Sequence, residues 1–292
     1  MLSISFSQNI TFYDKGNESF ADVKTQEFTF TCRVGGMEND KETIFLLHGF
    51  PETSRMWNEL IKVLENKGYR IIAPDQRGYS KGARPSKVSD YTIDKLSEDI
   101  INIANEFNID KFHLVGHDWG SAVGWYIVSK YSDRIITWTG LSVPHLDAFT
   151  NSMINDKTQK KKSEYINFFR IPILPELYFR IFSYKNLKSI WNQSSKSEVA
   201  SYLETFRQRG ALKSALNWYR ANFKNDNNLI GDIDTPTLII YGIHDAAIDI
   251  ISVDNSKNFL KGRYKIEKLD SGHWLIQESF EKVSKSIIEH IN

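Results

Sequence analysis

Several features that define large classes of protein are missing from this sequence. Its 292 residues include one cysteine, Cys32, so no disulfide can form within the chain, and a lone cysteine fits a reducing compartment. No stretch approaches the roughly 18 consecutive apolar residues of a transmembrane helix. The beginning, MLSISFSQNI, has neither the basic start nor the long apolar run of a signal peptide. These absences predict a soluble, cytoplasmic protein with no membrane partner.

Signatures of strong charge and of cofactors are absent as well. The 37 lysines and arginines nearly balance the 36 aspartates and glutamates, which leaves no basic footprint for nucleic acid. The sequence has no phosphate-binding loop, no Gly-x-Gly-x-x-Gly and no metal-ligand spacing, so we expect neither an organic cofactor nor a metal. The one lysine cluster, at positions 157, 160, 161 and 162, is interpreted as a solvated surface.

Short apolar runs separated by longer helical patterns are what the chain does contain. Most of the runs are brief and rich in Ile, Leu, Val, Phe or Tyr, as strands buried on both faces of a sheet should be. They are Glu27–Val34, Thr43–Leu47, Arg70–Ala73, Phe112–Gly116, Ile135–Leu141, Thr237–Tyr241 and Tyr264–Lys268. Helical patterns occupy 57–67, 94–107 and 119–131. This alternation predicts an α/β fold with a parallel sheet and crossover helices.

The strand rhythm stops between about Pro144 and Asp234 and returns at Thr237. The intervening stretch contains helical patterns and clusters of aromatic residues. A helical insertion between two strands of one sheet explains this better than two serial domains. We therefore predict a core of residues 1–143 and 235–292 and a helical cap of residues 144–234.

The sharpest chemical signal is Gly116-His-Asp-Trp-Gly, which joins the end of an apolar strand to a helical pattern. It has the frame of a nucleophile elbow, with Asp118 where a serine usually stands. Flanking glycines let strand and helix pack closely around a strained central residue, and the helix N-terminus stabilises a carboxylate there. Aspartate also serves as a simple helix cap. The strand end and the partners downstream favour a nucleophile.

A candidate acid and a candidate histidine follow in the chain order that this elbow requires. Asp245 comes just after the sixth predicted strand, and His273 follows the last strand, beside a turn glycine. We interpret His273 as the catalytic base and Asp245 as the carboxylate that orients its ring. Asp147, shortly after the fifth strand, and Asp249 remain alternative acids.

A glycine turn follows the second predicted strand, in the sequence His48-Gly-Phe-Pro. In folds with a nucleophile elbow, such a turn supplies one backbone N–H of the oxyanion hole, and the residue after the nucleophile supplies another. We assign these donors to Phe50 and Trp119.

Five motifs in order resemble the epoxide hydrolase branch of the α/β-hydrolase family, over a match that runs from Glu27 to the C-terminus. They are His48-Gly-Phe-Pro, Asp75-Gln-Arg-Gly-Tyr, Gly116-His-Asp-Trp-Gly, Asn217-Trp-Tyr-Arg and Gly272-His-Trp. The resemblance implies an α/β-hydrolase fold: a mostly parallel, twisted sheet of about eight strands flanked by helices, with an inserted helical cap. It also implies that Tyr165 and Tyr219 of the cap bind the epoxide oxygen. Arg170 stands where glutamine is more usual in this branch.

A carboxylate nucleophile suits displacement at a saturated carbon, which leaves an alkyl ester on Asp118. Water activated by His273 and Asp245 would then hydrolyse that ester. The resulting prediction is a hydrolase that opens a small apolar epoxide to a vicinal diol, without a cofactor.

Two alternatives stay open. A haloalkane dehalogenase would use the same triad, but Phe50 stands where the dehalogenase pattern usually has an asparagine that binds halide. A non-catalytic ligand-binding relative is more distant, because all three triad residues are present. For the assembly of the protein, we expect a monomer or a homodimer.

Overall fold

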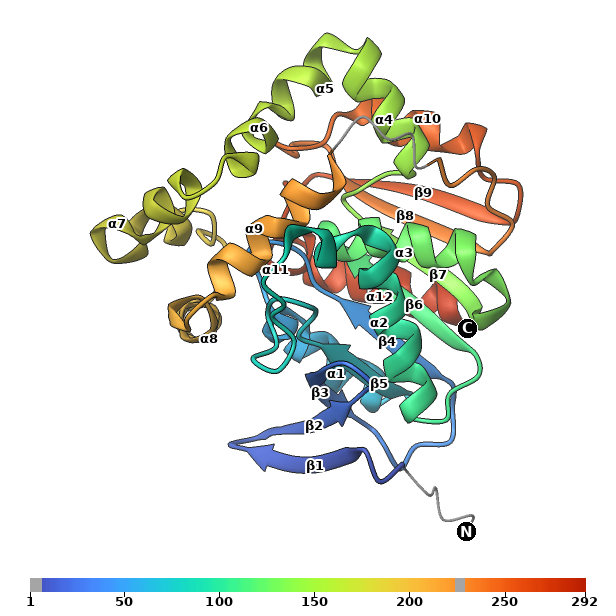
Figure 1. Cartoon of the computed structure of the whole chain (residues 1–292). Helices are drawn as coiled ribbons and strands as arrows, with labels where there is room; N and C mark the ends of the chain where they lie inside the picture. Colours follow the sequence, from blue (N-terminus) through green and yellow to red (C-terminus); the bar gives the residue numbers. More distant parts are fainter. Residues whose placement is uncertain (1–6, 224–228) are drawn as a thin grey trace.

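The computed structural model describes residues 7–223 and 229–292. Within these residues, nine strands form one sheet in the order β1-β2-β3-β5-β4-β6-β7-β8-β9. The strands are β1 (Ile10–Lys15), β2 (Glu18–Lys24), β3 (Thr29–Gly35), β4 (Thr43–Leu47), β5 (Arg70–Pro74), β6 (Phe112–His117), β7 (Ile135–Leu141), β8 (Thr237–Gly242) and β9 (Tyr264–Leu269). All pairs from β5 to β9 are parallel, and β1, β2 and β3 join antiparallel at one edge (Figure 1). The α/β-hydrolase fold predicted from the sequence is confirmed.

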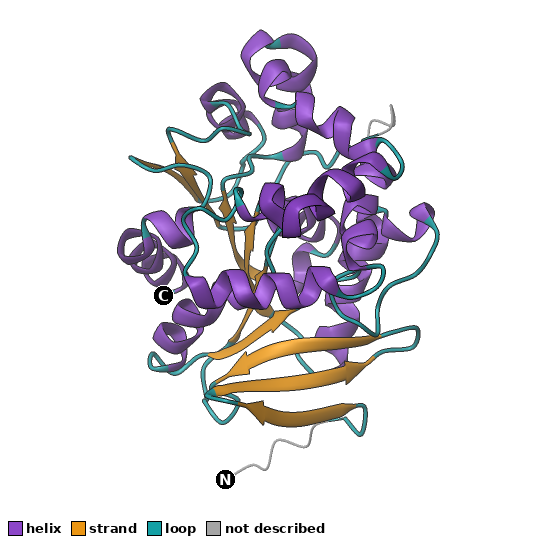
Figure 2. Ribbon diagram, turned by 90° about the vertical axis from the view of Figure 1, so that its left-hand side faces the viewer, coloured by secondary structure: helices purple, strands orange, loops and turns teal. Residues whose placement is uncertain are grey.

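The apolar strands lie in the middle of the sheet. Every residue of β4, β6 and β8 is buried, as expected for continuous apolar runs covered on both faces. The edge strand β1 is mostly exposed. Figure 2 shows the twist of the sheet and the helices on either side of it. The residues that end β4, β6 and β8 therefore come from the rigid centre of the molecule.

Helices cover both faces of the sheet. In Figure 1, α2 and α3 pack together in front of the sheet, and α1 and α12 contact each other behind it. The core helices are α1 (Asn58–Glu65), α2 (Ile93–Glu106), α3 (Trp119–Lys130), α10 (Ile250–Asn255), α11 (Leu275–Glu278) and α12 (Phe280–Ile291). Short 3-10 turns are η1 (Ser54–Trp57), η2 (Val88–Tyr91), η3 (Ser132–Arg134) and η4 (Ser256–Asn258).

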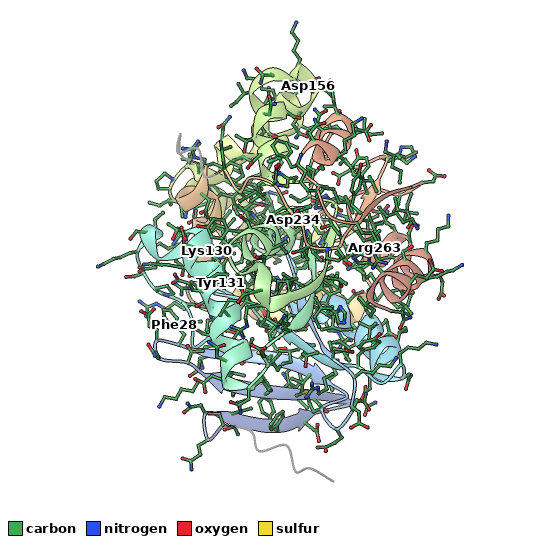
Figure 3. All side chains as sticks on the ribbon, turned by 90° about the vertical axis from the view of Figure 1, so that its right-hand side faces the viewer. Phe28, Lys130, Tyr131, Asp156, Asp234 and Arg263 are labelled. Atoms are coloured by element: carbon green, nitrogen blue, oxygen red, sulfur yellow. The ribbon has the colours of Figure 1, made fainter. Side chains whose placement is uncertain are left out.

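Between β7 and β8 the described chain is helical and carries no strand. These helices are α4 (Leu146–Asn155), α5 (Lys157–Lys162), α6 (Glu164–Arg170), α7 (Leu174–Lys188), α8 (Lys196–Arg207) and α9 (Ala211–Asn222). Figure 3 shows Asp156, the N-cap residue of α5, at the end of the molecule opposite β1. We refer to these six helices as the cap. Residues 1–6 of the predicted core and 224–228 of the predicted cap lie outside the described residues.

Candidate active site

Asp118 lies in a strained turn between β6 and α3. Its φ of 51° and ψ of −121° are unusual for a residue with a side chain. A Cβ added at Gly120 would collide with the carbonyl oxygen of Leu47, and one added at Gly116 would collide with the carbonyl of Gly120. Both flanking glycines are therefore required for the close approach of strand and helix. The turn has the geometry of a nucleophile elbow.

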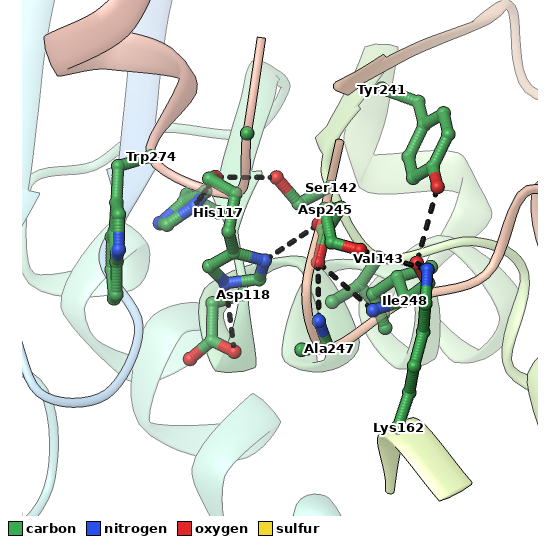
Figure 4. Close-up of polar contacts among 12 residues, drawn as sticks. His117, Asp118, Ser142, Val143, Lys162, Tyr241, Asp245, Ala247, Ile248 and Trp274 are labelled. Atoms are coloured by element: carbon green, nitrogen blue, oxygen red, sulfur yellow. Dashed lines mark hydrogen bonds and ion pairs between the residues drawn. The ribbon is translucent and has the colours of Figure 1, made fainter. Parts of the chain in front are cut away.

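His273 and Asp245 converge on this turn from two other loops. His273 Nε2 lies 3.5 Å from Asp118 Oδ2, and His273 Nδ1 lies 2.7 Å from Asp245 Oδ2 (Figure 4). The other oxygen of Asp245 accepts hydrogen bonds from the backbone N–H groups of Ala247, at 2.7 Å, and Ile248, at 2.9 Å. The imidazole is thus oriented by a carboxylate that is itself held by two backbone donors.

The charges of this cluster shift its pKa values in opposite directions. Burial alone would raise the pKa of Asp245, but His273 and the two backbone donors lower it below its usual value. Burial alone would lower the pKa of His273, but the carboxylates of Asp245 and Asp118 raise it well above its usual value. The nearby carboxylates therefore favour the protonated form of the His273 imidazole.

The two alternative acids, Asp147 and Asp249, make their contacts away from His273. Asp147 accepts hydrogen bonds at 2.9 Å from the backbone N–H groups of both Ile230 and Gly231, where the chain returns from the cap. Asp249 accepts one from the backbone N–H of Ile251 at the start of α10. Of the three candidates, Asp245 is the one that the structure brings to His273.

The expected oxyanion donors flank Asp118. The backbone N–H of Phe50, just after β4, donates to Asp118 Oδ1 at 2.7 Å. Trp119 is the first residue of α3, and N–H groups in the first turn of a helix lack an intrahelical acceptor. One oxygen of Asp118 is therefore already held, and the other faces His273.

The two tyrosines expected from the cap lie side by side and line the same cavity as Asp118. Tyr165 is on α6 and Tyr219 is on α9, with their ring centroids 6.3 Å apart. The Tyr219 ring packs edge-on against Trp119 at 5.1 Å. Burial, followed by the nearby charge of Asp118, raises the pKa of both phenols well above the usual value. Both hydroxyls therefore stay protonated and can donate hydrogen bonds.

A cavity of about 600 Å³ joins these groups. Asp118, Tyr165 and Tyr219 lie on its wall, and much of the remaining wall is apolar, including Leu146, Phe149, Met153, Ile166 and Phe223. A second hollow of about 660 Å³, beside β1, β2, β3 and α1, is lined by no histidine and lies apart from the triad. The first cavity is the one suited to a reacting ligand.

The sequence did not reveal that the cap also holds the loop of Asp245. Lys162 Nζ of α5 donates to the carbonyl oxygens of Asp245 and Ile248, both at 2.8 Å, and lies 3.4 Å from Asp249 Oδ2. The interpretation of the lysine cluster as a solvated surface is therefore wrong for Lys162, although its neighbour Lys161 is exposed. No local pattern distinguishes these lysines, because the difference arises only when α5 packs against a distant loop.

Gln159, one turn earlier on α5, binds the same loop and is fully buried. Its Oε1 accepts from the backbone N–H of Asp249, at 2.7 Å, and from Ser252 Oγ, at 2.9 Å. Its Nε2 donates to the carbonyl of Ala247 and to Ser163 Oγ, both at 2.9 Å. Lys162 and Gln159 together hold the loop that presents Asp245 to His273.

A buried pair supports the backbone of His273 from the other side. His117 Nε2 donates to the His273 carbonyl at 2.9 Å, and His117 Nδ1 lies 3.6 Å from Glu52 Oε2. Glu52 also accepts hydrogen bonds from Tyr202 of the cap, at 3.1 Å, and from Gln277, at 2.7 Å. Sequence motifs mark the positions of His117 and Glu52 beside the site, but not their contact.

Comparisons with known proteins agree with this geometry. The family model for the alpha/beta hydrolase fold matches residues 42–280. The chain is 32% identical to the AB hydrolase superfamily protein YfhM of Bacillus subtilis (strain 168), over 92% of this chain and 96% of that protein. It is 30% identical to Epoxide hydrolase 4 of Homo sapiens, over 93% of this chain and 78% of that protein. The solved structure of Epoxide Hydrolase A from Mycobacterium thermoresistibile superposes with a TM-score of 0.78 at 25% identity, covering 94% of this chain and 98% of that one.

The chain therefore belongs to the α/β-hydrolase family. Within that family its similarities place it in the epoxide hydrolase-like branch, and it is an enzyme.

Proposed function

We propose that this enzyme hydrolyses epoxides to vicinal diols, with Asp118 as nucleophile. The observation that carries the proposal is the position of the Asp118 carboxylate. It lies between His273 on the core side and the phenols of Tyr165 and Tyr219 on the cap side, at the wall of an apolar cavity. The apolar wall favours a small apolar epoxide as substrate. A cytoplasmic location, consistent with the lone and buried Cys32, is part of the same proposal.

The first step is displacement at carbon. Because Phe50 N–H holds Oδ1, the free oxygen Oδ2 attacks an epoxide carbon, and the carbon–oxygen bond breaks with its electrons going to the epoxide oxygen. Tyr165 or Tyr219 donates its proton to that oxygen as it becomes an alkoxide. The product of this step is an alkyl ester in which Oδ1 is the carbonyl oxygen.

Ester formation prepares the histidine for the second step. The ester is neutral, so the contribution of Asp118 to the raised pKa of His273 disappears. The imidazole then releases its proton, which replaces the one that the tyrosine gave up. A neutral His273, held by Asp245, is the species needed to act as a base.

The second step is hydrolysis at the carboxyl carbon of Asp118. Water gives a proton to His273 Nε2, and the hydroxide attacks the ester carbon. Negative charge develops on Oδ1, where the N–H of Phe50 already donates and that of Trp119 assists. The bond between the carboxyl carbon and Oδ2 then breaks, and Oδ2 leaves as part of the diol. The diol takes up the proton of the newly formed carboxyl group. Asp118 is ionised again and His273 protonated, as at the start.

Trapping the ester tests this scheme. The variant His273→Gln is mixed with epoxides and haloalkanes, and its intact mass is measured before peptide mapping. We expect a mass gain equal to the whole epoxide on the peptide that contains Asp118. The double variant His273→Gln with Asp118→Ala is the control and should gain nothing.

Other results would replace the proposal. A gain equal to an alkyl group without its halogen, and none with epoxides, would identify a haloalkane dehalogenase. Absence of any adduct, with no turnover of epoxides or haloalkanes by the wild-type enzyme, would overturn the assignment of Asp118 as nucleophile for these substrates.

A further inference from the structure

The outer end of the cap exposes an unusual amount of apolar surface. Among the described residues, 15 large hydrophobic side chains are exposed, and seven of them fall between positions 171 and 182. They are Ile171, Ile173, Leu174, Leu177, Tyr178, Ile181 and Phe182. We call residues 171–188 the cap tip. Figure 1 shows α7 at the left, projecting away from the body of the molecule. A patch of exposed apolar side chains is more often an interaction site than an ordinary part of the surface.

The backbone of the cap tip presents these side chains outward. Phe182, Ser183 and Tyr184 have φ values of 47°, 54° and 65°, in the left-handed region that residues with side chains disfavour. They break α7 into two parts with a turn between them. At this turn Phe182 is 80% exposed, the largest value among the exposed large hydrophobic side chains. A strained turn that holds an aromatic ring in water indicates a site where a ligand covers the ring.

The charge of the cap tip indicates what that ligand is. Arg180 and Lys185 are exposed and Lys188 is half-buried, and within the described residues none of the three has an ion-pair partner. The only acid of the cap tip is Glu176, which is already paired with Arg220 at 2.8 Å. The charged side chains of the cap tip that have no ion-pair partner are thus all cations, on a chain whose overall net charge is only +1.

We infer that the cap tip binds the surface of an anionic lipid bilayer. Phe182, Leu177 and their apolar neighbours would enter the boundary between headgroups and acyl chains, while Arg180, Lys185 and Lys188 contact lipid phosphates. Amphipathic elements with apolar and basic side chains bind membranes in this way without crossing them. The inference stands or falls separately from the proposed function.

The sequence predicted no membrane partner because it contains no transmembrane segment, and no helix in the described part of the chain is long and apolar enough to span a bilayer. Binding at the membrane surface requires neither a transmembrane segment nor a spanning helix. The inference therefore differs from the predicted absence of a membrane partner but agrees with the observation on which that prediction was based. What the sequence does not show is that the apolar residues of 171–182 stay exposed after folding.

A second copy of the chain is the other candidate to cover the cap tip. A two-fold contact would bring the same surface of both copies together. Arg180, Lys185 and Lys188 would then approach their equivalents, with no unpaired acid in the cap tip to compensate. An anionic bilayer supplies the negative charge that a second cap tip lacks, so we assign the surface to lipid.

Vesicle flotation tests the inference. We compare vesicles of phosphatidylcholine alone with equimolar phosphatidylcholine and phosphatidylglycerol, and expect the wild-type protein to float with the anionic vesicles and to be released by added salt. The triple variant Arg180→Gln, Lys185→Gln, Lys188→Gln should partition about 100-fold less, from the usual contribution of three basic residues. A matched control removes three exposed lysines of α5, with Lys157→Gln, Lys160→Gln and Lys161→Gln, and should bind almost as well as wild type.

A second pair of variants separates insertion from simple charge attraction. Leu177→Ser with Phe182→Ser should lower partition by at least about tenfold, since two apolar side chains no longer leave water. Tyr264→Ser, which changes an exposed apolar residue outside the cap, should have no effect. Because these side chains are exposed, apart from the half-buried Lys188, circular dichroism should show folded proteins throughout.

Three results would overturn the inference. One is a wild-type protein that floats with neither kind of vesicle. Another is a lack of charge selectivity, seen either as equal binding to neutral and anionic vesicles or as an equal loss of binding in the α5 control. The third is a concentration-dependent dimer in light scattering that Phe182→Ser abolishes, which would assign the cap tip to a second copy of the chain.

Discussion

Core and cap hold their parts of the site by different physical means. In the core, Asp118, His273 and Asp245 follow strand ends and are held by hydrogen bonds of 2.7–2.9 Å. In the cap, Tyr165 and Tyr219 are fixed mainly by packing of aromatic rings, among them Phe169 at about 5 Å from both. Hydrogen bonds are directional and packing is not. The core therefore fixes the directions of its polar groups, whereas the cap can vary its residues and change which substrate fits.

The largest expected effect is loss of Asp118, the proposed nucleophile of the core. Asp118→Ala should lower kcat by about 10⁴-fold or more, because Asp118 is the one carboxylate among the described residues that line the cavity. Steady-state hydrolysis of an epoxide measures it. Asp270→Ala, which removes an exposed carboxylate three residues before His273, should remain active. Comparable activity of the two variants would mean that Asp118 is not the nucleophile.

Removing one hydroxyl from the cap should have a smaller effect. Tyr219→Phe or Tyr165→Phe should lower kcat/KM for epoxides by about 100-fold, as expected for loss of one proton donor. The remaining phenol still stabilises the alkoxide, so the double variant should be worse than either single one. Tyr178→Phe, at an exposed position of the cap, is the control. If both single variants keep full activity, the tyrosines serve packing alone.

The contact from the cap to the acid loop should matter less again. Lys162→Met should lower kcat about tenfold with little change in KM, because a loosened loop misplaces Asp245 and hence His273. Burst kinetics should assign the loss to ester hydrolysis, with ester formation spared. Lys162→Arg should recover part of the rate, and Lys161→Met should match wild type. A rise in KM at constant kcat would mean that Lys162 shapes the cavity and leaves the triad untouched.

The smallest expected effect is on stability against pH. The pKa of His273 is raised in the folded protein, so its stabilisation is complete below the unfolded value of about 6.5 and is lost as pH rises through the folded value. The pKa of Asp245 is lowered, so its contribution is present above about pH 4 and is lost as pH falls through the folded value. Wild type should therefore melt about 2–4 °C above His273→Gln at pH 6. The difference in melting temperature should be smaller at pH 10. A constant difference would show that the charge on His273 contributes nothing to stability.

The central fold was predictable because its strands are continuous apolar runs. All seven predicted strands occur, with ends shifted by no more than two residues, as for Glu27–Val34, which is found at Thr29–Gly35. The missed strands β1 and β2 lie at an edge, where β1 is largely exposed and so lacks an apolar pattern. An antiparallel edge hairpin leaves little trace in a sequence that is read for buried strands.

The residues of the site also fall into two groups, those that the sequence could predict and those that it could not. The elbow, the histidine and the acid belong to short motifs next to strand ends, so the sequence could nominate Asp118, His273 and Asp245, and the structure brings them together. The roles of Lys162 and of the pair His117 and Glu52 depend on contacts between segments 65 or more positions apart. No local pattern encodes such contacts, which follow from the packing of the cap on the core.

The hydrogen bonds of Asp147 have a consequence for how the cap can change over time. The carboxylate at the start of the cap binds Ile230 and Gly231 at its end, so the two ends of this long insertion are tied to each other. In polymer terms the cap is a loop closed at its base, and a closed loop can be lengthened or shortened at little further entropic cost. Segments between these ties are thus free to be exchanged among relatives while the sheet beneath keeps its register. Asp147, first considered as a catalytic acid, is better understood as the residue that joins the two ends of the cap where the cap meets the core.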